Sequence, residues 1–401
     1  MKRINGIIPI KRTLPIITTR NVRRKELPNK TLQMLFVLII TCLLLTPIGG
    51  CSNVKIEDRV RHISFSPDGK KIIFNRRKAE GPNLINVYDL ESGELSAYQS
   101  PSNETWTMAG YSFDGKYIVF SITPRGEKYL ELEKMQIAVM DPEGKNVRRI
   151  TNGSGAKIYP SFSHSGKKVI FVKAGRIRER GKTPAADYDI YEVDIETGQE
   201  TRLTWFKFFM MSPPYYFPDD ETIIFSAYGP PSIYPGIAED DYEAIRKKAE
   251  ELKEKSIQGF GKRGTANWIP SIHDNIYVMK KGEKELPEPL IRSKDDMRSP
   301  TLTYAGKIFF EAPAYKPDGS GDWSQIFEYS PDDNHRRITN IQGRGIKSWA
   351  VSPDGEMLAV VFSGEIMEIS VYRVKDGSVQ EISLPDQPLR IINGTEQNRI
   401  D

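Results

Sequence analysis

Four histidines are the residues of this sequence best suited to acid–base or metal chemistry, and they stand far apart. Their positions are 62, 164, 273 and 335, each more than 60 residues from the next. Catalysis or metal binding would require such side chains to converge within bonding distance. The sequence also lacks a Gly-x-Ser-x-Gly nucleophile motif and a complete Gly-x-x-x-x-Gly-Lys-Ser/Thr phosphate loop. We therefore predict no catalytic cluster, no metal site and no cofactor.

Cys51 is a second reactive position, because its thiol can carry a lipid. It follows Ile48-Gly49-Gly50, whose glycines let a peptidase approach the backbone. Before it come nine lysines and arginines and the apolar run 35–45, which is shorter than the roughly 20 apolar residues of a spanning helix. This order predicts a lipoprotein signal peptide over 1–50 and lipidation at Cys51; the alternative is an uncleaved anchor helix. Either way we expect an extracytoplasmic protein, lipid-anchored on the periplasmic side or in the outer membrane.

The charge balance argues against a nucleic-acid partner. The whole sequence has 57 Lys/Arg and 53 Asp/Glu, a formal net charge of +4. Residues 1–51 contribute nine of the basic residues and one of the acidic residues, so the remainder has a net charge of −4. A nucleic-acid-binding domain would instead carry a basic excess.

A short motif recurs along the chain and organises the rest of the sequence. Its clearest copy is Ser66-Pro67-Asp68-Gly69-Lys70, followed by an apolar run. The turn positions of the six copies are Gly69, Gly115, Gly166, Asp220, Gly306 and Gly355. The intervals are 46, 51, 54, 86 and 49 residues. A period of this size predicts a propeller or a solenoid.

Each copy reads as a hairpin, since proline presets φ, aspartate bonds its own backbone and glycine accepts positive φ. A second hairpin follows each copy, as at Asp89–Glu94 and Asp141–Lys145. Two hairpins make a four-stranded blade, so the sequence predicts an all-β, six-bladed β-propeller over 59–384. Residues 51–58 would be a short tether, and 385–401 a C-terminal tail or closing strand. The strand that seals the ring would come from 54–57 or from 389–392.

These repeats resemble the TolB-like six-bladed propeller family. The resemblance rests on Phe65-Ser66-Pro67-Asp68-Gly69-Lys70 and on the blade-closing segment from Met140-Asp141-Pro142-Glu143-Gly144-Lys145 to Thr151, and it covers 58–384. It implies the fold but little about activity, because similar blades occur in envelope scaffolds, oligopeptidase gating domains and sugar-acting enzymes. TolB carries an α/β domain before its propeller, where this sequence offers only 52–58, so we do not expect a role identical to that of TolB.

The 86-residue interval predicts an insertion in blade 4, at about 227–272. Within it, 239–255 has an acidic start, a basic end and apolar residues at helical spacing, which predicts one helix. Other blades lengthen the same connection, so one face of the ring gathers the insertions, and such a face is usually the binding surface. The candidate residues on it are Arg176, Arg178, Arg180, Lys182, Trp205, Tyr234, Trp268, Tyr315 and Trp323.

Basic groups and flat rings of this kind suit an anionic glycan, a peptide or a protein partner. The leading hypothesis is therefore a non-enzymatic binding or scaffold propeller of the cell envelope. One alternative is a structural subunit that docks through the blade 4 helix. Another is an enzyme acting on a glycan or a lactone in the central channel. The enzyme would need polar side chains to converge at the channel mouth, and the inner-strand starts offer Arg61, Tyr159, Arg298, Ser299 and Lys347.

Overall fold

A computed structural model describes most of the chain after the export segment. The described residues are 59–77, 83–127, 130–177, 185–228, 244, 247, 274–291, 293, 295–315, 321–363, 368–385 and 387–393. The predicted signal peptide, Cys51 and the tether lie outside them and stay predictions. Among the described residues no helix is long and apolar enough to cross a membrane.

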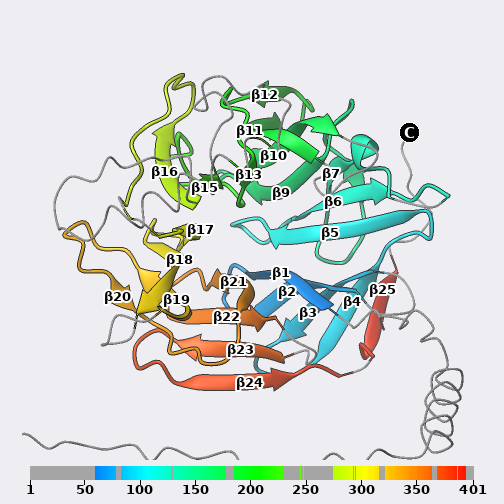
Figure 1. Ribbon diagram of the computed structural model, residues 1–401. Coiled ribbons are helices and arrows are strands. Elements are labelled where there is room, and N and C mark those ends of the chain that lie inside the picture. The colour runs from blue at the N-terminus through cyan, green and yellow to red at the C-terminus, as the bar shows by residue number, and fades with distance from the viewer. Residues whose placement is uncertain are drawn as a thin grey trace, which may run out of the picture. The chain divides into compact units, whose positions relative to one another are not determined.

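Six antiparallel sheets form the blades of a propeller, as the repeats predicted (Figure 1). Blades 1 to 3 contain β1 (Arg59–Phe65), β2 (Lys71–Arg77), β3 (Leu84–Asp89), β4 (Leu95–Gln99), β5 (Glu104–Tyr111), β6 (Ile118–Pro124), β7 (Gln136–Met140), β8 (Arg148–Arg149), β9 (Lys157–Phe162), β10 (Lys168–Ile177), β11 (Ala185–Asp194) and β12 (Glu200–Arg202). Blades 4 to 6 contain β13 (Met210–Met211), β14 (Tyr215–Tyr216), β15 (Thr222–Tyr228), β16 (Asp274–Lys280), β17 (Arg298–Leu302), β18 (Ile308–Tyr315), β19 (Gly321–Glu328), β20 (Arg336–Arg337), β21 (Ile346–Val351), β22 (Met357–Phe362), β23 (Glu368–Arg373) and β24 (Val379–Ser383). A single 3-10 helix, η1 (Leu132–Lys134), lies before β7.

The recurring motif forms the turn from the first to the second strand. In blade 1 the Ser66 hydroxyl donates to Asp68 Oδ1 at 2.6 Å and accepts the amide of Lys71 at 2.9 Å. Gly69 follows with a φ of 69°, a left-handed conformation that favours glycine. Ser112 with Asp114, and Ser352 with Asp354, repeat the hydroxyl–carboxylate bond. The motif is thus a self-satisfied turn, which explains why it recurs.

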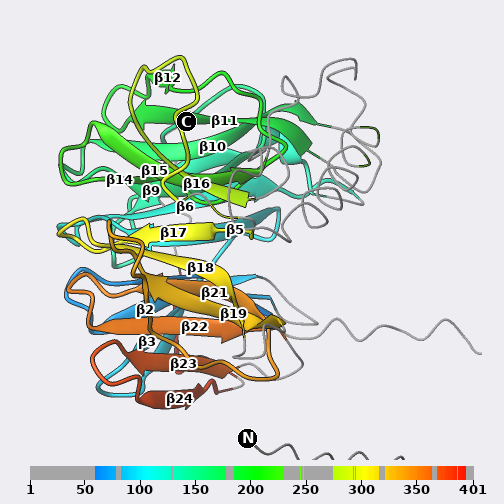
Figure 2. The ribbon, with the colours of Figure 1, turned by 60° about the vertical axis from the view of Figure 1, so that its left-hand side comes forward.

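The core lies between the blades and continues around the ring. Six apolar clusters each join two neighbouring blades, and the cluster joining blades 1 and 6 contains Phe65, Phe74, Val361 and Val371. Figure 2 shows this sequence of blades from the side, with β15 and β16 above β17 and with β22 to β24 below it. Burial against both neighbours therefore stabilises every blade.

The C-terminal segment closes the ring, which settles the choice between the two predicted strands. Strand β25 (Arg390–Asn393) pairs with β4 in parallel, with Arg390 opposite Ser96. Blade 1 thereby becomes a five-stranded sheet, with β4 and β25 adjacent at the rim (Figure 1). The buried Arg76 donates to the carbonyl of Pro385, so the segment leading to β25 is tied to blade 1.

Blade 4 departs from the predicted pattern. Its inner strand is split into β13 and β14 by Pro213 and Pro214, which cannot donate to the ladder. No fourth strand is described there, because the segment beyond β16 contains Pro287 and Pro289. The helical insertion predicted for this blade is not supported, since the described elements are strands and η1 alone. Apart from residues 244 and 247, the segment 229–273 lies outside the described residues.

Candidate functional site

The inner strands share a local distortion beside the channel. His62, Met108, Tyr159 and Ser299 are non-glycine residues with φ between 51° and 60°. Each coincides with a register shift between its strand and the second strand of the blade. A residue held in this conformation costs about 1–3 kcal/mol, and a bulge re-aims the side chains around it. The strain therefore marks these positions of the inner strands as a candidate site.

A cavity of about 330 Å³ lies where these distortions meet. All five residues that the sequence offered for the channel mouth line it: Arg61, Tyr159, Arg298, Ser299 and Lys347. Further lining residues are His62, Met210, Pro213, Tyr215, Asp274, Glu311 and Trp349. A second cavity of about 170 Å³ shares His62, Tyr159, Tyr215 and Trp349, so the two are continuous along the channel.

One side of this cavity is basic. Arg61 and Lys347 come from the neighbouring strands β1 and β21, and both side chains are exposed. Burial, followed by the positive charges of Arg61 and Lys347, lowers the pKa of His62 to about 4. The imidazole is therefore neutral near pH 7. Arg61 has no hydrogen bond or ion pair with any other described residue, so its guanidinium is available to an anion.

The other side of the cavity is acidic. Arg298 Nη2 lies 3.4 Å from Asp296 Oδ2, and its Nε lies 3.9 Å from Glu311 Oε1. Burial raises the pKa of Glu311, and the negative charges of Asp274 and Asp296 raise it further, against the opposing effect of Arg298. This carboxylate therefore favours a nearby positive charge or a proton.

Aromatic side chains form much of the remaining wall. The His62 and Tyr159 ring centroids are 5.7 Å apart, and burial raises the pKa of Tyr159. Trp349 is 9% exposed and lines both cavities, while its indole Nε1 has no hydrogen-bond partner among the described residues. An unpaired buried donor costs about 1–3 kcal/mol. The indole is thus a natural fluorescence reporter for events in the cavity.

Comparison with known proteins bears on the fold of this chain. No family model matches it. TolB from Acinetobacter baumannii superposes with a TM-score of 0.50 at 17% identity, over 88% of this chain and 69% of that one. The chain folds as a TolB-like six-bladed β-propeller. A structure titled oligogalacturonate lyase in complex with manganese matches with a TM-score of 0.49 at 14% identity, over 81% of this chain and 76% of that one.

The nine residues predicted for the elaborated face of this TolB-like propeller do not line the cavity. Arg176 is paired with Asp187, 2.7 Å from Nη2 to Oδ2. Trp205, Tyr315 and Trp323 are 49%, 47% and 44% exposed. Arg178, Arg180, Lys182, Tyr234 and Trp268 lie outside the described residues. The binding surface proposed from them stays a prediction.

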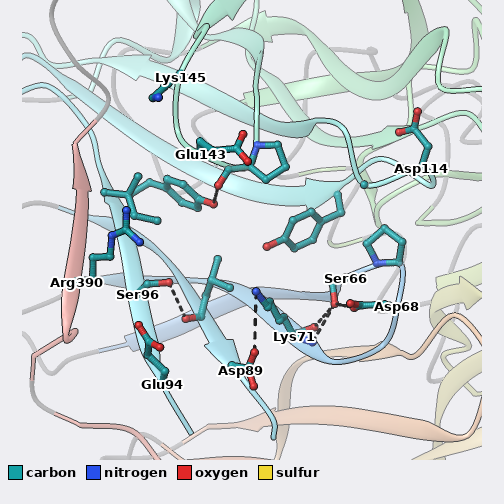
Figure 3. A pocket seen from close by; sticks show the side chains of 17 residues that line it. Ser66, Asp68, Lys71, Asp89, Glu94, Ser96, Asp114, Glu143, Lys145 and Arg390 are labelled. Atoms are coloured by element: carbon teal, nitrogen blue, oxygen red, sulfur yellow. Dashed lines mark hydrogen bonds and ion pairs between the residues drawn. The ribbon is translucent and has the colours of Figure 1, made fainter. Parts of the chain in front are cut away.

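A larger cavity, of about 680 Å³, lies between blades 1 and 2 of the propeller at the hairpin turns (Figure 3). Its carboxylates already serve the turns, since Asp68 accepts from Ser66 and Asp89 accepts the amides of Glu91 and Ser92. Lys71 Nζ lies 4.0 Å from Asp89 Oδ2. The cavity is open and of mixed charge, and it carries none of the inner-strand distortions.

The channel mouth of the propeller is therefore the stronger candidate. The sequence missed Asp274, Glu311 and Trp349 because it considered only the starts of inner strands. One available signal was Glu311, a charged residue within the apolar strand β18, where burial of an ionisable group is costly. Among the described residues no group of three or more His, Cys, Asp or Glu side chains is arranged to hold a metal ion.

Proposed function

We propose that this propeller binds a ligand carrying a carboxylate, such as an acidic sugar or a peptide end, at the mouth of its channel. The observation that carries the proposal is the pairing of Arg61, exposed and without an ion-pair partner among the described residues, with Lys347 on one cavity wall. A guanidinium binds a carboxylate through two parallel hydrogen bonds, and a second cation strengthens the attraction. The cavity volume falls at the lower end of small-molecule sites.

Replacing Arg61 with glutamine tests this proposal. We expect about a tenfold loss of affinity for carboxylate probes, because one charge-assisted hydrogen-bonding partner contributes about 1.4 kcal/mol or more. Calorimetric titration with digalacturonate and N-acetyl-triglycine, each against its uncharged counterpart, measures the loss. Arg373→Gln, an exposed arginine at the end of β23, is the matched control. Equal affinities of the Arg61 variant and the unchanged protein would refute the proposal.

Catalysis in the channel is a second candidate function, favoured by one observation. The five polar residues that an enzyme would need do converge, and neutral His62 stands beside them. A neutral imidazole next to two cations could accept a proton from a bound acid. Incubating the same probes with the protein and analysing the products separates the two functions, since a binding protein returns them unchanged.

We also propose that lipidation of Cys51 anchors the protein outside the cytoplasm. The support is the order of basic stretch, apolar run and Ile48-Gly49-Gly50-Cys51 in the sequence. Stable anchoring takes more than one acyl chain, and all of them depend on the Cys51 thiol. We expect Cys51→Ser to leave an uncleaved precursor without lipid. Metabolic labelling with a palmitate analogue and membrane fractionation check this, with Cys42→Ser as the control; a labelled Cys51 variant would contradict it.

A further inference from the structure

The channel mouth carries opposite charges on opposite walls. We propose that its ligand is a small zwitterion, with its carboxylate at Arg61 and Lys347 and its ammonium group at Asp274 and Glu311. This inference rests on the proposed carboxylate site and adds the second group to be recognised. It assigns a substrate class, molecules with a free amine and a free acid such as short peptides, rather than simple acids.

The ring places the two walls far apart in the blade order. The basic residues belong to β1 and β21, in the adjacent blades 1 and 6, whereas Asp274 begins β16 of blade 4 and Glu311 lies in β18 of blade 5. In a six-membered ring, blade 4 stands across the channel from blade 1. Both walls nevertheless line the one cavity. A ligand that fills it therefore meets both signs of charge.

The acidic wall has more negative than positive charge among the described residues. Asp274, Asp296 and Glu311 surround Arg298, the positive charge with printed ion pairs to this group, and its contacts are 3.4 and 3.9 Å long. The Glu311 side chain is 8% exposed. Partly desolvated carboxylates held close together repel one another, and a bound ammonium group relieves that repulsion.

The surfaces between the walls are apolar and suit a short, compact ligand. Met210, Pro213 and Tyr215 line the cavity between the charged groups. The volume of about 330 Å³ limits the ligand to a few linked units. An extended tripeptide spans at most about 10 Å from end to end. Triglycine is therefore a suitable probe, because it has both end charges and no side chains.

Three probes with one skeleton test the inference on the unchanged protein. They are triglycine, which has both charges, N-acetyl-triglycine, which has only the carboxylate, and triglycine amide, which has only the ammonium group. We expect triglycine to bind at least tenfold tighter than either blocked form, measured by calorimetry and by the fluorescence of Trp349. Muramic acid and N-acetylmuramic acid repeat the comparison on a sugar, and so show whether peptide or sugar zwitterions fit better.

Two variants assign each charge to its wall. Asp274→Asn should remove the tenfold preference while leaving the affinity for N-acetyl-triglycine within about twofold. Arg61→Gln should weaken both acids. Glu356→Gln, an exposed carboxylate at a hairpin turn, is the matched control. Glu311→Gln replaces the first variant if Asp274→Asn fails to fold.

The outcomes separate this inference from the proposed function. If the blocked acid binds as tightly as triglycine and loses affinity in Arg61→Gln, the zwitterion inference is overturned and the carboxylate site stands. If no probe with a carboxylate binds, or if Arg61→Gln changes nothing, both are overturned. A tenfold preference for the zwitterion that Asp274→Asn abolishes supports both.

Discussion

Replacing Glu192 with glutamine should lower the free energy of unfolding by about 3 kcal/mol at pH 7. Glu192 lies 2.5 Å from Lys168 Nζ, accepts the Tyr216 hydroxyl at 2.6 Å and lies 3.6 Å from Lys281 Nζ. It thus joins blade 3 to blade 4. The Lys281 side chain is only 13% exposed, so the variant leaves a buried ammonium group with a weaker partner. We take the low end of the usual cost because Lys168 is 37% exposed.

The stabilisation by Glu192 should also depend on pH. Burial raises the pKa of its carboxyl, but the hydrogen bonds from Lys168 and Tyr216 and the charge of Lys281 outweigh burial and lower the pKa below its usual value. A lowered folded-state pKa contributes stability that is present above the unfolded pKa, about 4.3, and is lost as the pH falls through the folded pKa. Urea unfolding of the unchanged protein and Glu192→Gln between pH 7 and pH 3 measures this.

The matched control is Glu91→Gln, since Glu91 is 83% exposed and lies 4.0 Å from Lys70. Exposed pairs of this kind contribute from nothing to about 1 kcal/mol. If Glu192→Gln unfolds at the same urea concentration as Glu91→Gln, the role assigned to this carboxylate in joining the blades is wrong.

Lys157 should make the protein more stable as the pH rises from 8 to 9.5. This lysine is fully buried at the start of β9, and its ammonium group donates to the Gly153 carbonyl at 2.9 Å and to Gln136 Oε1 at 3.0 Å. Burial lowers its pKa from 10.5 to about 8. Above pH 8 the unfolded chain therefore binds a proton that the folded chain has lost. Stability increases with pH wherever the unfolded state binds more protons, here by up to about 2 kcal/mol.

Thermal unfolding between pH 8 and 9.5 tests this expectation. The window ends below pH 10, where the tyrosines of the unfolded chain begin to ionise and destabilise the fold. Lys157→Met removes the titrating group at similar volume and should flatten the profile, whereas Lys167→Met, at an exposed position, should leave it unchanged. A profile that falls with pH in the unchanged protein would show that Lys157 keeps its proton.

The sequence predicted the six blades because each first turn satisfies its own hydrogen bonds locally. Ser66 and Asp68 need no distant partner, so their spacing signals the same turn in any blade. Blade 4 was harder to predict, because Pro213 and Pro214 divide its inner strand. The effect of two prolines on strand pairing depends on which edge they face.

The candidate site was predictable on one wall only. Arg61 and Lys347 follow from the rule that inner strands begin at the channel mouth, and the structure places both there. Asp274 and Glu311 belong to other strands, so their approach to the channel depends on twist and on packing between blades. The sequence also left open whether Phe208 was core or surface, and the structure buries it completely.

The parallel pairing of β25 with β4 has a consequence for synthesis on the ribosome. Strand β4 ends at Gln99 and β25 begins at Arg390, roughly 290 residues later. At about 5–20 residues per second, blade 1 waits some 15–60 s with one edge unpaired. Unpaired edges recruit foreign strands, so this interval is when the nascent chain is most prone to aggregate or to need a chaperone.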